Sequence, residues 1–387
     1  MRGHLSRSSA LSHLKGGAIQ LLALIFLLLQ NAAGPLLYGG ENYGATFFFL
    51  SFVFILQGAL ESVFFAVTIE RLGEDRHERP PPLGTMWRDG AVLAILVLIG
   101  TGVVLTLRGD GRYMVWLVPI ASAQFVTTAL MGLAYGTQRL RLVFSANLMA
   151  LVAFTTAMLV MRKVDSSFGL MGAFLAHQIA AAFRLLCDAP LRRLGRANLA
   201  PATRDARTYL VAFFTRAPVL VLGNGLIVAA GILFDYRVVA IAKIYLSLMN
   251  AGRFVLPLSG PVLQSIATRE RGGDGDSTRI VLAFAACFWV VLAGLLFFAA
   301  PRIAAALLDT PSQTGFGLIW LFIGMPAYLL MQPLALAAFA AGAHRRIILS
   351  FLVAISFGIV ILVPFGLVAG FVTSVFLYVA VMVLAPR

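Results

Sequence analysis

Charged residues are scarce in this chain. Only 12% of its 387 residues are Asp, Glu, Lys or Arg, whereas 60% are hydrophobic, and the mean hydropathy is +0.92. A soluble domain is about 25% charged and about 45–50% apolar, and no soluble interior is large enough to bury this much apolar surface. The composition therefore excludes a cytosolic enzyme, a secreted disulfide scaffold and a disordered chain. It predicts a polytopic membrane protein.

Residues and motifs that carry common enzyme chemistry are also few. There are two cysteines without a CxxC spacing and five scattered histidines, and neither GxxxxGK[ST] nor HExxH occurs. These patterns give no support for a disulfide, a metal site or a nucleotide-binding loop. No Ser/His/Asp arrangement stands out either. The sequence therefore favours a carrier over an enzyme, with no catalytic residue, metal or cofactor assigned.

What the sequence does contain is a series of long apolar runs with short interruptions. A transmembrane helix needs about 20 apolar residues. We predict an all-α polytopic membrane fold of about twelve helices. Their ranges are 16–37, 44–69, 90–107, 114–136, 142–161, 168–187, 210–234, 238–264, 280–300, 314–342, 346–363 and 366–385.

The first and last runs each leave an alternative open. The first follows Arg2, Arg7 and Lys15, as in a signal peptide, but its length and the later spans favour a retained helix. Only Pro364-Phe365-Gly366 separates the last two runs. Residues 346–385 therefore form either two spans or one kinked segment.

The net charge of +14 comes from 30 Lys+Arg against 16 Asp+Glu. With the N-terminus inside, the predicted cytoplasmic segments hold 20 of the cations and the outer segments hold six. This excess predicts that both termini are cytoplasmic and makes a nucleic-acid partner unnecessary. Aromatic residues near span ends are predicted to anchor the membrane interface: Trp116, Tyr38, Tyr43, Tyr236 and Tyr378.

The two longest hydrophilic connections are 70–89 and 188–209. The second separates two sets of six predicted helices. We therefore predict an N-terminal six-helix bundle over 1–187, a cytoplasmic linker over 188–209 and a C-terminal six-helix bundle over 210–387. Because six is an even number, both bundles enter from the same side, as parallel repeats do.

Apart from Arg346 at the very start of a run, five charged residues fall within predicted spans: Glu61, Arg184, Arg216, Lys243 and Arg253. Such charges cost about 2.5–3.5 kcal/mol each on insertion scales and tend to be functional. Glu61 and Arg253 lie deepest, which implies a polar cavity or a structural ion pair between them. The other three lie close enough to a helix end to extend toward water.

Helical periodicity places several polar residues on common faces. Lys243, Ser247, Asn250 and Arg253 share one face, and Gln57 shares one with Glu61. Four cations against one acid suit a phosphate or diphosphate, which guanidinium groups bind bidentately. The alternative for the amides and hydroxyls is hydrogen bonding between helices. We predict substrate-binding roles for Arg216, Lys243, Asn250 and Arg253, and coupling or gating roles for Glu61 and Gln57.

Three short segments also resemble a known family. They are Glu41-Asn42-Tyr43-Gly44, then Gly136-Thr137-Gln138-Arg139-Leu140-Arg141 followed by Asn147, and Ala341-Gly342-Ala343-His344-Arg345-Arg346. Together with the layout, they resemble the oligosaccharide/polysaccharide flippase branch of the multidrug/oligosaccharidyl-lipid/polysaccharide exporter superfamily. Unlike the drug-exporting branch, the first predicted helix has no acidic residue.

The resemblance implies two six-helix bundles around a central cavity and alternating access. It implies transfer of a polyprenyl-diphosphate-linked oligosaccharide across the bacterial inner membrane for lipopolysaccharide or exopolysaccharide assembly. The expected partners are this lipid, membrane lipids, a coupling ion (H+ or Na+), and a glycan polymerase or glycosyltransferases of the pathway. The alternatives are a drug or metabolite cation antiporter of the same fold, and a membrane glycosyltransferase or polymerase. The short outer loops disfavour the last alternative.

Overall fold

The computed structural model describes residues 18–19, 21–61, 83–137, 139–163, 166–189, 191, 221–255, 275–309, 316–340 and 343–384. Within these ranges the regular structure is helical throughout, with no strand. Eight of the described helices are long and apolar enough to cross a membrane. Helices satisfy their own backbone hydrogen bonds, which a lipid-facing segment requires. The expectation of an all-helical membrane fold is therefore confirmed.

The chain divides into two compact units. Unit 1 comprises Met1–Ala33 and Phe52–Tyr209, and unit 2 comprises Gly34–Ser51 and Leu210–Arg387. The sequence-based division into 1–187 and 210–387 did not anticipate that Gly34–Ser51 would group with the second half of the chain.

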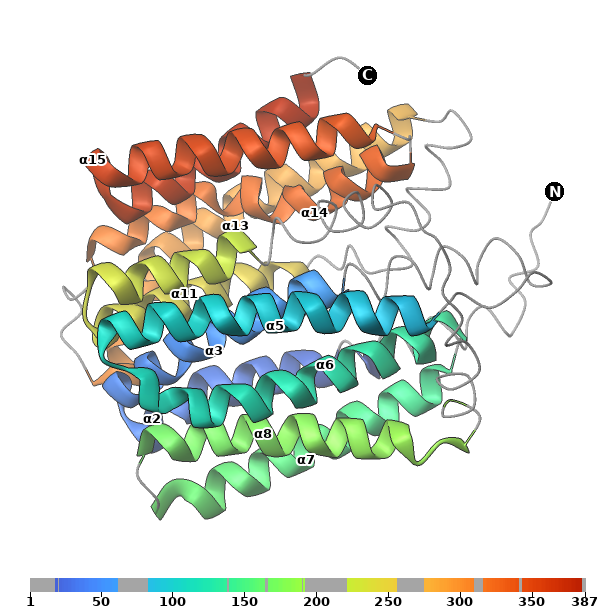
Figure 1. Ribbon diagram of the computed structural model, residues 1–387. Coiled ribbons are helices and arrows are strands. Elements are labelled where there is room, and N and C mark those ends of the chain that lie inside the picture. Colours follow the sequence, from blue (N-terminus) through green and yellow to red (C-terminus); the bar gives the residue numbers. More distant parts are fainter. Residues whose placement is uncertain are drawn as a thin grey trace. The chain divides into compact units, whose positions relative to one another are not determined.

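Unit 1 is built largely from antiparallel helices of about twenty residues. Helix α8 packs against both α6 and α7, and Figure 1 shows α7 and α8 running side by side. Short 3-10 segments, η3 (Gly111–Tyr113) and η4 (Met161–Lys163), precede α6 and α8. The longer helices are α5 (Leu83–Arg108), α6 (Met114–Gly136), α7 (Leu140–Val160) and α8 (Ser166–Leu186).

The described part of unit 2 contains a helix over Val221–Leu233 and several other helices. Helix α13 packs on α11 and α14, and α14 packs on α15 (Figure 1). The elements are α2 (Gly34–Tyr38), the first part of α3 (Gly40–Glu61), α11 (Tyr236–Val255), α13 (Gly275–Leu308), η5 (Phe316–Gly324), α14 (Met325–Ala340) and α15 (His344–Leu384).

Helix α15 resolves the alternative left open for residues 346–385. Gly366 has φ +85°, outside the helical region, directly after Pro364-Phe365. Arg346 Nη2 donates a hydrogen bond of 2.8 Å to the carbonyl oxygen of Val383, thirty-seven residues along the chain. A Cβ built at Gly358 would collide with Ser374 Oγ. The segment is therefore a pair of antiparallel helices joined at Gly366, which confirms the prediction of two spans.

The first span is irregular where the chain passes from unit 1 to unit 2. Residues Leu29–Ala33 form a π-helix, η1, which buries Gln30 and Asn31. Gly39, with φ +79°, then separates α2 from α3. A π-helical turn widens the backbone locally and often accompanies functional sites.

The predicted interface anchors behave differently from expectation. Tyr38, Tyr43 and Tyr378 are each at most 3% exposed. For these three residues the prediction was wrong, because their rings pack among helices rather than facing the membrane surface. A position near a span end gives depth but does not say which way the side chain faces.

Candidate functional site

Lys243 is the one charged residue among the buried side chains that the structure describes. It lies on α11, within unit 2, and is 9% exposed. Its Nζ lies 4.4 Å from the ring centroid of Phe47, a fully buried residue of α3. An ammonium over an aromatic face is stabilised by about 0.5–2 kcal/mol. The Lys243 side chain is thus held inside the protein, and it does not extend outward to water.

Gly44 allows α3 to approach α11 closely enough for this contact. A Cβ built at Gly44 would collide with the carbonyl oxygen of Tyr236. On the same stretch of α3, the rings of Phe48 and Phe49 lie 6.0 and 6.1 Å from that of Tyr236. The Glu41-Asn42-Tyr43-Gly44 segment, first noticed as a resemblance, therefore has a packing role in this chain.

Asn250 lies farther along α11 and links it to α14. Its Nδ2 donates to the carbonyl oxygen of Leu246 at 2.9 Å, and its Oδ1 accepts a hydrogen bond of 3.4 Å from the hydroxyl of Tyr328. A Cβ at Gly223 would lie 2.7 Å from that hydroxyl, so glycine makes room for it. Sequence reasoning missed Tyr328, because a tyrosine inside a long apolar run gives no periodic signal.

Trp289 of α13 was also missed. Its indole N–H donates to the carbonyl oxygen of Gly252 at 3.1 Å, and the side chain is 1% exposed. A buried indole needs such a partner, and this one fixes α11 beside the position of Arg253. Arg253 belongs to α11, but its side chain is not among those that the structure describes. Arg216 lies outside the described residues altogether.

In unit 1 the structure brings Gln57 and Glu61 together, one helical turn apart on α3. The amide of Gln57 donates to Glu61 Oε1 at 2.7 Å, and both side chains are half-buried. The shared face predicted for these two residues is confirmed, whereas the predicted pairing of Glu61 with Arg253 falls outside the description.

Neutral polar side chains occupy the contact between α6 and α8. Gln124 Nε2 donates to Thr128 Oγ1 at 3.0 Å, and Thr127 Oγ1 donates to the carbonyl oxygen of Gln178 at 3.1 Å. Next to Gln178, the ring of His177 stacks on Phe26 with centroids 4.4 Å apart. The second of these bonds joins two helices, the role that bundle interiors commonly give to hydroxyls.

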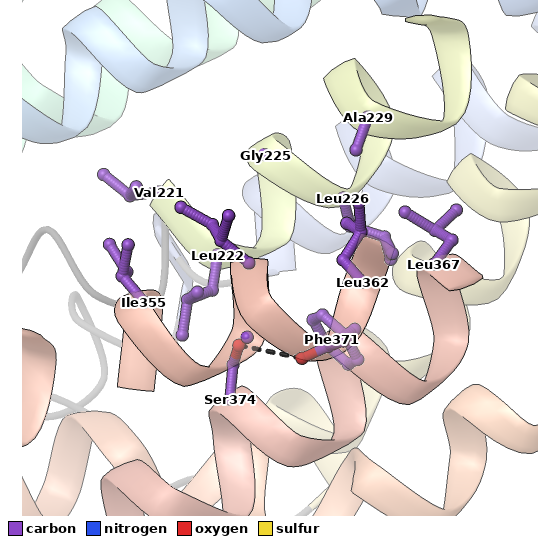
Figure 2. Close-up of a pocket in the computed structure, with 13 residues that line it drawn as sticks. Val221, Leu222, Gly225, Leu226, Ala229, Ile355, Leu362, Leu367, Phe371 and Ser374 are labelled. Carbon is purple, nitrogen blue, oxygen red and sulfur yellow. Dashed lines mark hydrogen bonds between the residues drawn. The ribbon is translucent and has the colours of Figure 1, made fainter. Parts of the chain in front are cut away.

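An apolar cavity of about 220 Å³ lies within unit 2, between the helix Val221–Leu233 and both arms of α15 (Figure 2). Its wall includes Phe371, whose ring lies 5.8 Å from that of Tyr328. Among the described residues, no three His, Cys, Asp or Glu side chains gather as metal ligands would.

No protein-family model and no curated protein matches the sequence. Solved structures do match in fold. A lipid II flippase MurJ, in an inward closed conformation, matches with a TM-score of 0.64 and 10% identity, over 94% of this chain and 86% of that one.

A MATE transporter of Vibrio cholerae, VcmN in its bent form, matches with a TM-score of 0.56 and 15% identity, over 96% of this chain and 93% of that one. A point mutant of VcmN matches with a TM-score of 0.53 and 14% identity, over 95% of this chain and 92% of that one. The structures matched here are those of a lipid flippase and of a MATE transporter. At such low identity the likeness concerns architecture alone. This chain has the all-helical membrane fold found in the lipid II flippase MurJ and in the MATE transporter VcmN.

Proposed function

We propose that this protein is a flippase that moves a polyprenyl-diphosphate-linked oligosaccharide, or a related anionic glycolipid, between the leaflets of the bacterial inner membrane. Transport proceeds by alternating access, with both termini cytoplasmic. The fold supports a transporter of amphipathic or ionic cargo. The buried Lys243 supports an anionic cargo, and this observation carries the proposal.

The argument from Lys243 is one of charge. A cation held among apolar helices stabilises a negative ligand and repels a positive one, and a low-dielectric setting strengthens both effects. A diphosphate forms charge-assisted hydrogen bonds, which are roughly twice as strong as neutral ones. It is therefore a better partner for the ammonium than the ring of Phe47. A drug or metabolite cation antiporter calls for a buried carboxylate in the same place.

We further propose that Arg216, Asn250 and Arg253 complete the diphosphate site. Asn250 supplies an amide to the sugar or phosphate, while Tyr328 orients it. Glu61 and Gln57 couple transport to an H+ or Na+ gradient, because a carboxyl with an amide partner one turn away can exchange a bound cation. A glycan polymerase or the glycosyltransferases of the same pathway would act before and after this step.

Reconstitution tests the proposal directly. Purified protein is placed in liposomes with a fluorescent polyprenyl-diphosphate oligosaccharide, and its movement is followed by quenching the outer leaflet with dithionite. We expect Lys243→Met to slow movement about tenfold or more, since a charge-assisted contact to phosphate is lost. Lys243→Arg should keep most of the rate.

Ser350→Ala is the matched control, because Ser350 is buried in the same unit and its hydroxyl bonds only within α15, to the carbonyl oxygen of Arg346 at 2.7 Å. A wild-type rate of lipid movement in Lys243→Met would refute the role proposed for Lys243 in binding the cargo. Efflux of organic cations without movement of the lipid would favour the antiporter.

To test coupling, Glu61→Gln should abolish the response of the rate to an imposed H+ or Na+ gradient.

A further inference from the structure

The cavity of unit 2 is lined almost wholly by hydrocarbon. Ser374 is the one polar side chain among its thirteen lining residues, all of which are described. The hydroxyl of Ser374 donates to the carbonyl oxygen of Gly370 at 2.8 Å, drawn as a dashed line in Figure 2, so its donor is already used. Figure 2 shows Leu226 of the helix Val221–Leu233 and Leu362 of α15 among the side chains that line this space. The cavity is therefore suited to an apolar occupant.

One wall of the cavity is kept open by a glycine. A Cβ built at Gly225 meets no heavy atom within 4 Å, so this part of the helix Val221–Leu233 faces free space. On the opposite wall, Gly358 and Gly370 let the two arms of α15 pack tightly against each other. The space therefore lies between the helix Val221–Leu233 and the α15 pair, and the two arms of the pair are themselves in close contact.

The rim of the cavity carries exposed apolar side chains. Ile359 lines the cavity and is also 59% exposed, and nearby Val363 and Phe365 at the turn of α15 are 79% and 71% exposed. Exposed apolar side chains on a membrane-spanning helix are suited to contact with lipid tails. A hydrocarbon chain can thus enter from the bilayer without crossing water.

The inner wall of the cavity adjoins the polar groups of α11. Phe371 forms part of the wall and its ring packs on Tyr328, the residue that donates to Asn250. Leu222 lines the cavity, and the next residue, Gly223, makes room for the Tyr328 hydroxyl. Tyr328 therefore separates the apolar space from the polar face of α11, as at the junction between the head and tail of a lipid.

We propose that this cavity holds a short length of the isoprenoid chain of the transported lipid while its diphosphate lies near α11. The proposal rests on the function proposed above. An apolar cavity of about 150 Å³ lined by Leu, Ile and Phe stays dry and binds benzene. The 220 Å³ found here therefore suits a slightly larger piece of branched hydrocarbon. Leaving the bilayer gives the chain no hydrophobic gain, so its selection depends on close packing against the lining.

Photolabelling tests the proposal. The probe is a polyprenyl diphosphate with a diazirine near the diphosphate end of the chain, added to protein in phosphatidylethanolamine and phosphatidylglycerol nanodiscs. We expect labelled peptides from 221–233 and 355–374, and displacement of the label by unmodified polyprenyl diphosphate. Gly225→Leu fills the cavity and should reduce this labelling and the rate of lipid movement by about tenfold. Gly225→Ala should give a smaller reduction.

Gly294→Leu on α13 is the matched control, because a Cβ there also meets nothing within 4 Å, and it should leave both readouts unchanged. The cavity would be a general lipid site if a diazirine-bearing phospholipid labelled it equally well and resisted displacement by polyprenyl diphosphate. This result would overturn the proposal. Wild-type movement in Gly225→Leu would also overturn it, while leaving the flippase function intact. Labelling of the cavity in a protein that moves no lipid-linked glycan would instead refute the function and keep the tail site.

Discussion

Unit 1 and unit 2 both bury polar side chains among apolar helices, but they bury different kinds. In the described part of unit 1 these side chains are neutral, as at the Gln124–Thr128 bond within α6 and the Thr127–Gln178 bond between α6 and α8. In unit 2 they include Lys243, with its ammonium over Phe47. Neutral groups that bond within the bundle stabilise packing, whereas a buried cation also discriminates between ligands by charge. With the function proposed above, recognition of cargo charge is expected to belong to unit 2.

The largest effect should come from separating α3 from α11. Gly44→Leu forces a side chain against the backbone of Tyr236, and overpacking costs about 1–3 kcal/mol or more. We expect a clear fall in Tm in detergent and loss of transport. Gly100→Leu on α5 of unit 1, where a Cβ meets nothing within 4 Å, is the control and should leave Tm nearly unchanged. Equal melting of the two variants would contradict the role given to this contact.

The buried ammonium of unit 2 should matter more to the rate of lipid movement than a buried amide of unit 1. Against the tenfold or greater slowing expected for Lys243→Met, we expect Gln178→Leu to change the rate of lipid movement less than about twofold, because it removes a neutral amide. The measurement is the same liposome assay. The comparison between the units would fail if Gln178→Leu slowed lipid movement as much as Lys243→Met does, with the Tm of the two variants equal.

A smaller effect is expected from the hydrogen bond that joins α6 to α8. Thr127→Val keeps the shape of the side chain but removes its donor to the carbonyl oxygen of Gln178. A buried hydrogen bond contributes about 0.5–1.5 kcal/mol, so Tm should fall modestly while transport stays intact. Ser122→Ala on the same helix, whose hydroxyl bonds only to Val118 of α6, is the control. Loss of transport with an unchanged Tm would mean that this contact has more than a packing role.

The smallest effect should follow from breaking the ion pair at the end of α8. Arg139 Nη1 lies 2.7 Å from Asp188 Oδ1, and both side chains are partly exposed, at 33% and 21%. Exposed pairs of this kind contribute about 0–1 kcal/mol. Arg139→Gln should therefore lower Tm by a degree or two at most, with less effect at high salt. A large and salt-independent loss would show that the pair is more important to unit 1 than its exposure indicates.

Much of the helical layout was predictable from apolar run length. The run at 114–136 coincides with α6, and the pair of spans over 346–385 corresponds to the two arms of α15. Run length predicts such spans because each lipid-facing helix must satisfy its own backbone. Periodicity likewise placed Gln57 beside Glu61, since residues four apart on a helix meet.

The contacts between helices were not predictable in the same way. Nothing local in Tyr328, Trp289 or Gly225 marks them as parts of the polar site or of the cavity. Each acquires its role from a residue far away in the chain, such as Asn250 for Tyr328 and Gly252 for Trp289. Hydropathy measures the preference of a segment for lipid, and it contains no information about which helix will be its neighbour.

The sequence by itself thus determined that this chain is a helical membrane protein with Lys243, Asn250 and Arg253 on one face of a helix, because composition and period are local properties. Only the tertiary structure decided that residues 34–51 pack with the second half of the chain, that Lys243 faces Phe47, and that a hydrocarbon-lined space lies beside Tyr328. The physical reason is that helices in a membrane associate through shape. Close approaches such as that of Gly44 to Tyr236 depend on how two distant surfaces fit together.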